Sequence, residues 1–142
     1  MTQEEKELLL KDLCARLPYG VKVAFFNEDL THHSESITLT GIECINNLNY
    51  SSLEDEDGNT TIVEFVKPYL FPLSSMSEEQ KQEYTYIMNY ISPDDTDNWK
   101  EGEFIYVEQF TQLMHFYHIN HLDYRGLIHM GLAEDATRLN IY

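Results

Sequence analysis

The sequence predicts an α+β fold, with an N-terminal helix, a small antiparallel sheet or partly open barrel of four to five strands, and C-terminal helices. Three observations predict it: helical spacing of apolar residues before residue 18, alternation of apolar and polar residues between 19 and 71, and renewed helical spacing after residue 77. The 142 residues suit one domain, and no repeat or linker divides them. We therefore expect a single domain over residues 1–142.

The first helix is predicted over residues 3–17. Thr2 and Glu5 have the spacing of a capping box, in which each side chain covers the other residue's unpaired amide. Pro18 and Gly20 are expected to end the helix. Apolar side chains recur at i, i+3, i+4 and i+7, and the stripe that they form is expected to face a core: Leu10, Leu13, Cys14 and Leu17.

Four strands are predicted between residues 19 and 71, at 21–25, 37–45, 48–53 and 60–66. The apolar residues of the second strand change parity halfway, so a bulge or bend at Gly41 is expected to return them to one face. Asp57 and Gly58 have the composition of a hairpin turn, and Pro68 and Pro72 are expected to end the regular pairing. An N-terminal helix followed by a bent strand also begins small Sm-like or SH3-like barrels, so the barrel alternative stays open.

Three C-terminal helices are predicted, at about 77–91, 103–118 and 124–130. Ser77 offers an N-cap, and acidic residues fill the first turn after it, where the helix dipole favours negative charge. The second of these helices carries an apolar stripe: Phe104, Val107, Phe110, Met114 and Tyr117. Gly131 is expected to stop the last one.

The chain is strongly acidic, with 25 acidic against 9 basic residues and a formal net charge of −16 at pH 7. A field of this sign repels phosphates, so direct nucleic-acid binding is not expected. The charge also opposes adsorption on anionic lipid, and no apolar run approaches the roughly 20 residues that span a bilayer. The expected partner is therefore another protein, a basic one in particular, and not a membrane.

Two features favour the cytoplasm as the compartment. The N-terminal residues are acidic and polar and lack the basic and apolar regions of a secretory signal. Two cysteines do not make a disulfide framework, and Cys14 and Cys44 occupy positions that predict buried, inert thiols.

Three histidines recur near the end of the predicted helix 103–118. Residues three apart on a helix are neighbours, so His115 and His118 could share a metal ion, with His121 and Asp123 completing the site where the chain turns. The established metalloprotease patterns differ, since they place histidines at i and i+4 with a glutamate between them. The alternative, which we favour, is that these are interfacial imidazoles at the edge of an aromatic-rich helix.

A second candidate patch follows directly, because the segment after the helix brings an imidazole, a carboxylate, a phenol and a guanidinium together. We take the candidate binding residues to be His118, His121, Asp123, Tyr124 and Arg125. These groups could do acid–base work or hold a carboxylate or phosphate. They could equally fix a loop, with Asp123 capping the last helix and Arg125 binding carbonyls, and we favour that interpretation.

The sequence offers no catalytic motif. It has no phosphate-binding glycine loop, no nucleophile elbow and no Cys-x-x-Cys pair, so no cofactor is expected and an enzyme is less expected than a binding protein. We predict a non-catalytic macromolecular interaction module. Nine acidic residues and no lysine or arginine lie within 27–66, which favours one alternative, a charge-mimic inhibitor of a nucleic-acid-binding protein. A second alternative is a metal-dependent enzyme that uses the histidine cluster.

Several stretches resemble a group of small proteins from gut-bacterial genomes and prophages. The resemblance covers residues 11–21, 66–79, 120–128 and 131–133, which is about a quarter of the chain. It implies a mobile-element or phage setting and a single compact domain. It implies no activity, cofactor or catalytic residue.

Overall fold

The computed structural model describes residues 1–45, 50–89 and 99–142, and the side chains within them except those of 32–35, 45, 50 and 99–106. Its regular elements are α1 (Gln3–Arg16), β1 (Lys22–Phe26), β2 (His32–Ile45), β3 (Tyr50–Asp55), β4 (Thr60–Thr61), β5 (Val66–Leu70), α2 (Glu78–Met88), α3 (Trp99–Ile119) and β6 (Glu134–Asp135). Short 3₁₀ turns cover Leu17–Tyr19, Val63–Phe65 and Leu73–Ser75. Among the described helices, none is long and apolar enough to cross a membrane.

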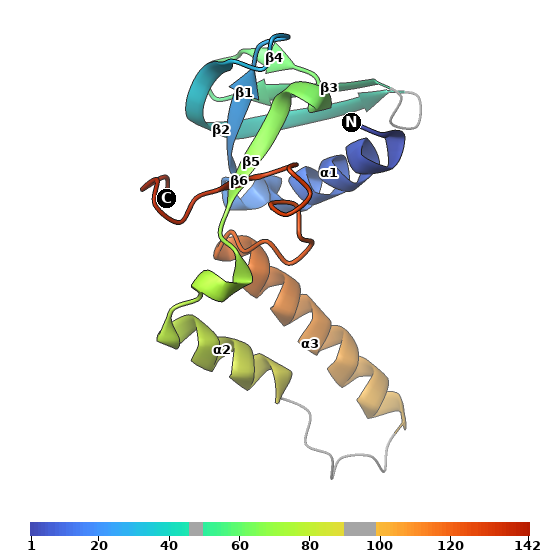
Figure 1. The fold of residues 1–142 in the computed structure, drawn as a ribbon. Helices are drawn as coiled ribbons and strands as arrows, with labels where there is room; N and C mark the ends of the chain where they lie inside the picture. Colours follow the sequence, from blue (N-terminus) through green and yellow to red (C-terminus); the bar gives the residue numbers. More distant parts are fainter. Residues whose placement is uncertain (46–49, 90–98) are drawn as a thin grey trace.

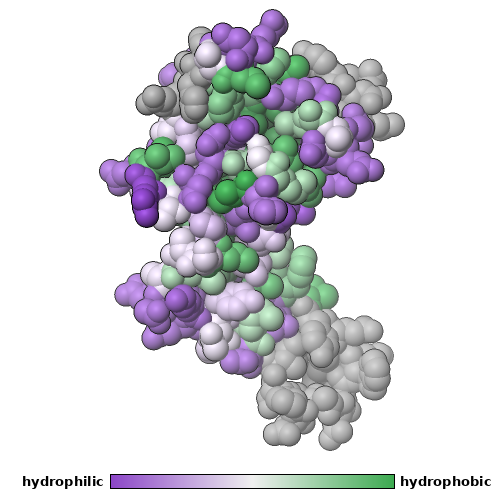
Figure 2. Space-filling model, viewed as in Figure 1, coloured by the Kyte–Doolittle hydropathy of each residue, from purple (hydrophilic) through white to green (hydrophobic). Residues whose placement is uncertain are grey.

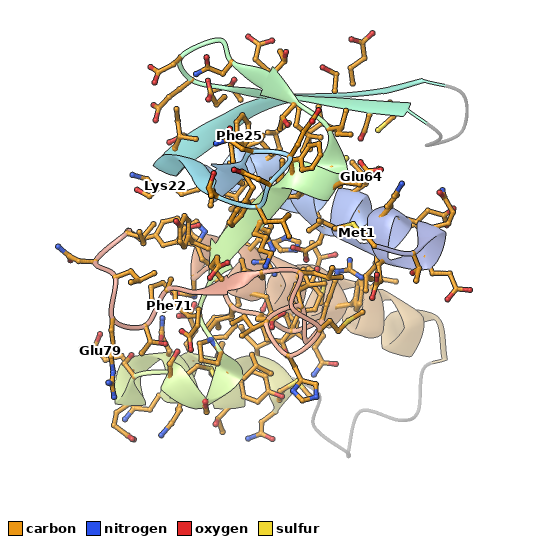
Figure 3. The ribbon with its side chains drawn as sticks, turned by 45° about the horizontal axis from the view of Figure 1, so that its top comes forward. Met1, Lys22, Phe25, Glu64, Phe71 and Glu79 are labelled. Carbon is orange, nitrogen blue, oxygen red and sulfur yellow. The ribbon has the colours of Figure 1, made fainter. Side chains whose placement is uncertain are left out.

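The molecule has two parts (Figure 1). The sheet and α1 form the first, which we call the body, and α2 and α3 form a helical hairpin that projects from it, which we call the arm. Phe71 lies at the junction, where the chain leaves β5 towards α2 (Figure 3). The α+β fold predicted from the sequence is confirmed, with an N-terminal helix, a mostly antiparallel sheet and C-terminal helices.

The sheet is open rather than closed into a barrel, and its strand order is β4-β3-β2-β1-β5-β6. Every pairing is antiparallel except that of β5 with β6. The six strands exceed the four to five expected, for two reasons. The predicted strand 60–66 is divided by the 3₁₀ turn Val63–Phe65, and β6 adds a two-residue strand from the C-terminal segment.

Two local features of the strands agree with the sequence and one does not. The pairing of β2 with β3 shifts register between Leu39 and Gly41, which is the predicted bulge. Gly58 takes the left-handed conformation, with φ of +82°, in the predicted turn between β3 and β4. Pro68, however, lies inside β5 opposite Val23 instead of ending the pairing. On the other side of β5 the pairing with β6 begins at Tyr69, after the proline.

The body core lies between α1 and the sheet. Thr2 and Glu5 form the predicted capping box, and α1 then packs its aliphatic side chains against the inward face of the strands. The buried stripe of α1 runs through Leu9, Asp12, Leu13 and Arg16, so Cys14 is turned to solvent. The prediction that both cysteines are buried was wrong, since Cys14 and Cys44 are both exposed. The predicted stripe of α1 left out Asp12 and Arg16, a charged pair that is buried where Cys14 was expected.

The arm has its own aromatic cluster, in which Ile87 of α2 packs against Phe116 and Tyr117 of α3 and against Leu122. Ser77 caps α2 through a capping box with Gln80, as its position predicted. The predicted end of this helix, at residues 90–91, lies outside the described residues. The start of α3 lies four residues before the expected one, and its end one residue after the expected 118.

The predicted helix 124–130 is not formed. Residues 124–131 make a series of turns, and the carboxylate of Asp123 accepts hydrogen bonds from two backbone amides, at 2.8 Å from Leu127 N and 2.9 Å from Ile128 N. Two glycines in left-handed conformations, Gly126 and Gly131, bend the chain within this stretch. The spacing that suggested a helix is therefore used to fold a compact loop.

Candidate functional site

The residues singled out in the sequence separate into three groups in the structure. His118, Tyr124 and Arg125 join one polar network, which is centred on two residues of α1. His121 lies apart from it and packs on the C-terminal tyrosine. Asp123 is occupied by the loop that it caps.

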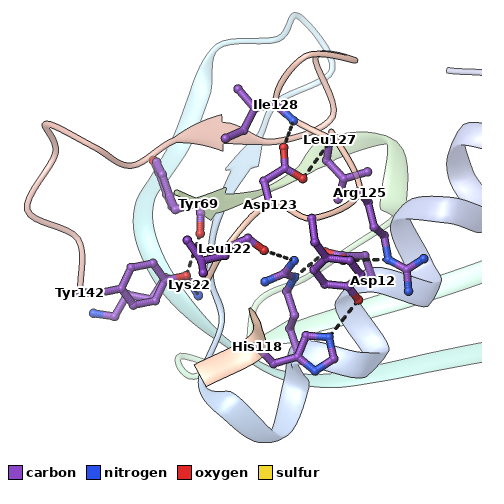
Figure 4. Close-up of polar contacts among 12 residues, drawn as sticks. Asp12, Lys22, Tyr69, His118, Leu122, Asp123, Arg125, Leu127, Ile128 and Tyr142 are labelled. Atoms are coloured by element: carbon purple, nitrogen blue, oxygen red, sulfur yellow. Dashed lines mark hydrogen bonds and ion pairs between the residues drawn. The ribbon is translucent and has the colours of Figure 1, made fainter. Parts of the chain in front are cut away.

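Asp12 and Arg16 form the centre of the network, and both are completely buried. Arg16 Nε donates to one carboxylate oxygen of Asp12 at 2.7 Å, and Arg125 Nε donates to the other at 3.1 Å. Arg16 Nη2 also donates to the carbonyl oxygen of Leu122 at 2.7 Å. Both guanidinium groups lie over the ring of Tyr124, at 5.3 and 5.0 Å from its centroid. Figure 4 shows these contacts tying α1 to the segment after α3.

The network continues along α3 through hydrogen bonds between rings. The hydroxyl of Tyr124 lies 2.9 Å from Nε2 of His118, which is buried. Tyr19 packs against this imidazole and its hydroxyl lies 3.1 Å from Nδ1 of His115. Burial lowers the pKa of His118, and the charge of Arg16 lowers it further. His118 is therefore held neutral near pH 7.

His121 completes the end of α3. Its φ of +53° and the hydrogen bonds from His121 N to His118 O and from Leu122 N to Tyr117 O form a Schellman motif, in which glycine usually holds this position. Its ring stacks on Tyr142 with centroids 3.6 Å apart. Burial lowers the pKa of His121 to about 4, and its Nδ1 has no hydrogen-bond partner among the described residues.

The three histidines do not converge. His115 is hydrogen-bonded to Tyr19, and His118 to Tyr124. His121 stacks on Tyr142 of the C-terminal segment. In the part of the chain that the structure describes, no group of three or more histidine, cysteine, aspartate or glutamate side chains is arranged to hold a metal ion. The polar network thus provides a structural joint between α1, α3 and the loop after it, in which the carboxylate of Asp12 is shared by the guanidinium groups of Arg16 and Arg125.

An open groove lies beside this joint, on the arm. It has a volume of about 660 Å³ and runs between α2 and α3, with Tyr19 and His115 near the body. Its sides are largely apolar, formed by Tyr86 and Ile87 of α2 and by Phe110 and Met114 of α3, among others. Tyr86 and Phe110 are 67% and 62% exposed, and Val107, one turn before Phe110, is 66% exposed. Figure 2 shows hydrophobic surface over α3 in the lower half of the molecule.

The groove was not predicted from the sequence, because an apolar stripe in a sequence does not show whether another element of the protein covers it. Phe110 and Met114 belong to the predicted apolar stripe of α3, together with Tyr117. In the structure Tyr117 of this stripe and Phe116 beside it pack against α2, whereas Phe110 stays 62% exposed. The sequence did contain one indication of the groove. Apolar residues occur on two faces of this helix, and one neighbouring helix can cover only one of them.

No protein-family model, curated protein sequence or solved structure matches the chain. The resemblance to small proteins of gut bacteria and prophages accordingly stays a prediction.

Proposed function

We propose that the protein is a non-catalytic interaction module that binds another protein through the groove of the arm. The observation that carries this proposal is the exposure of Phe110 and Tyr86, which both line the groove, one from α3 and one from α2. Exposed aromatic side chains that share one concavity are typical of protein-binding surfaces, because their burial on association supplies most of the binding free energy.

The contacts of Asp12, Asp123 and His118 support the same proposal. Asp12 is shared by two arginines, and Asp123 by two amides, so both carboxylates are engaged in contacts within the molecule. His118 lines the groove but is hydrogen-bonded to Tyr124. These contacts make rigid support for a docking surface, which lowers the entropic cost of binding.

Site-specific photocrosslinking from the full chain tests the proposal. A benzophenone amino acid replaces Phe110 in one variant and Leu30 in a matched control, since Leu30 is 71% exposed but lies in the body. We expect discrete adducts with a partner protein from position 110 and none of these from position 30. Identical adducts from both positions, or adducts from position 30 alone, would overturn the proposal.

A second candidate function, charge mimicry of a nucleic acid, is favoured by the absence of lysine and arginine from residues 27–66. Two of the acidic residues in this region make contacts within the protein. Asp55 accepts hydrogen bonds from the amides of Asp57 and Asn59, and Glu64 forms an ion pair with Lys6. Capture of basic proteins at low salt that is lost at high salt is the result expected of a mimic. Absence of any basic partner at low salt would remove this candidate.

We further propose that the protein acts in the cytoplasm. The support is that Cys14 and Cys44 are both free and exposed, a state that reducing compartments maintain. A phage or mobile-element setting is proposed on the sequence resemblance alone.

A further inference from the structure

We propose that the occupant of the groove is a basic amphipathic helix of a partner protein, which would pack against α2 and α3 as the third helix of a bundle. This inference rests on the proposed function and names the chemistry of the partner.

The shape of the groove follows from the packing of two helices. Ile87, Phe116 and Tyr117 fill the contact between α2 and α3. On the adjacent side Tyr86 and Glu83 project from α2, and Phe110 and Met114 project from α3, so that the two helices form the walls of a trough. A pair of antiparallel helices accepts a third helix most readily in such a trough, where its apolar stripe meets both walls.

The lining of the trough suits aliphatic and aromatic side chains at helical spacing. Phe110 and Met114 lie one turn apart on the same face of α3, and the unbranched side chain of Met114 can adapt to a partner's shape. An occupant with apolar residues at i, i+3, i+4 and i+7 would place them along this row. An extended strand would gain less here, because the arm offers no free strand edge for its backbone.

The charge around the trough selects the sign of the occupant's polar face. Among the described side chains of α2 and α3 four are acidic, Glu78, Glu79, Glu83 and Glu108, and Glu83 lines the groove. Lys81, the only lysine or arginine among the described side chains of the arm, is paired with Glu78. A partner helix with lysine and arginine on its outer face would meet complementary charge, and an acidic helix would be repelled.

The test uses three fluorescein-labelled peptides of 20 residues and the full chain, followed by fluorescence anisotropy. The first has leucines at helical spacing and lysine and arginine on the other face. The second replaces every basic residue by glutamate, and the third keeps the basic composition but scatters the leucines. We expect the first to bind at least tenfold more tightly than either of the others, and to weaken as salt rises.

Variants of the chain locate the site. Phe110→Asp is expected to weaken binding of the first peptide at least tenfold, and Glu83→Lys at least threefold. Glu43→Lys makes the same change of net charge on β2 in the body and is expected to leave binding unchanged. Because all three positions are exposed, the fold is expected to persist, and circular dichroism checks that it does.

The outcomes separate the two proposals. Equal binding of the first and third peptides, or equal effects of Glu83→Lys and Glu43→Lys, would show attraction by net charge alone and overturn the helix proposal. Failure of the first peptide to bind would overturn it as well. In either case photocrosslinks from position 110 to a partner protein would still uphold the proposed function, and their absence would overturn that function separately.

Discussion

The body and the arm bury their side chains in different ways. In the body, α1 covers one face of the sheet and the C-terminal segment covers part of the other, so its aliphatic core is enclosed. In the arm, two helices share one aromatic contact, and Val107 and Phe110 of α3 remain largely exposed. We infer that the enclosed core of the body and the joint supply most of the stability of the fold, while the arm supplies an exposed apolar surface for binding.

The joint between the two parts explains how the arm can project and still be fixed. Asp12 and Arg16 reach from α1 to Leu122 and Arg125 beyond the end of α3. Phe71 adds a second attachment, since its amide donates to the carbonyl of His121. The groove is therefore held by the body even though the body contributes little of its lining.

The largest effect is expected at the joint. Asp12→Ala leaves the buried guanidinium of Arg16 without its carboxylate, and we expect a loss of about 3–5 kcal/mol in the free energy of unfolding, measured by urea denaturation. The exposed pair Lys81–Glu78 is the matched control, and Glu78→Ala should cost at most about 0.5 kcal/mol. A loss of less than about 1 kcal/mol for Asp12→Ala would show that the joint does not hold the two parts together.

Next in size is the contrast between an enclosed and an uncovered apolar side chain. Leu13 is fully buried between α1 and the sheet, so Leu13→Ala should lower the free energy of unfolding by about 2–5 kcal/mol. Phe110→Ala removes a larger side chain, yet we expect a change within about 0.5 kcal/mol, because Phe110 is largely in water. Similar losses for the two variants would mean that Phe110 is part of a core.

The pH dependence of stability sharpens the account of the end of α3. The pKa of His121 is about 4 in the folded protein and about 6.5 when unfolded, so the unfolded chain binds more protons between these values. Its contribution to stability is complete above pH 6.5 and is lost as the pH falls towards 4. Between pH 7 and pH 5 the loss should be about 2 kcal/mol.

Urea denaturation across this pH range measures the loss, with His121→Asn as the variant, because asparagine tolerates the left-handed backbone and does not titrate. The variant should lose less stability than the wild-type chain between pH 7 and pH 5. His129→Asn, at an exposed position, should behave like the wild type. A steeper loss in His121→Asn would contradict the burial of this imidazole.

The smallest effect is expected in the loop after α3. Asp123→Ala frees the amides of Leu127 and Ile128, and we expect a loss of about 1 kcal/mol in the free energy of unfolding. Hydrogen exchange of these two amides should rise by a larger factor than that of β1, whose amides open only in global unfolding. Unchanged exchange at both amides would show that the carboxylate does not hold the loop.

Local rules predicted the parts of this fold that local chemistry decides. The capping box at Thr2, the N-cap at Ser77 and the bulge at Gly41 depend on neighbouring residues, and all three are confirmed. β6 and the joint depend instead on contacts between distant residues; Asp12 and Arg125, for example, are 113 positions apart. Loop fixing by Asp123 could be predicted because a carboxylate with following amides is a local pattern.

The central claim is that a partner helix binds in the groove of the arm, and the most direct test is to map which residues change their NMR signals when such a helix binds. In NMR spectra of the isotope-labelled full chain, titration with the basic amphipathic peptide should shift the amide signals of α2 and α3 around Tyr86, Phe110 and Met114. Signals of Tyr124, Arg125 and the turn around Gly58 should move little. The largest shifts at Tyr124 and Arg125 or at the acidic turn, with the arm unchanged, would contradict the assignment of the groove as the binding surface.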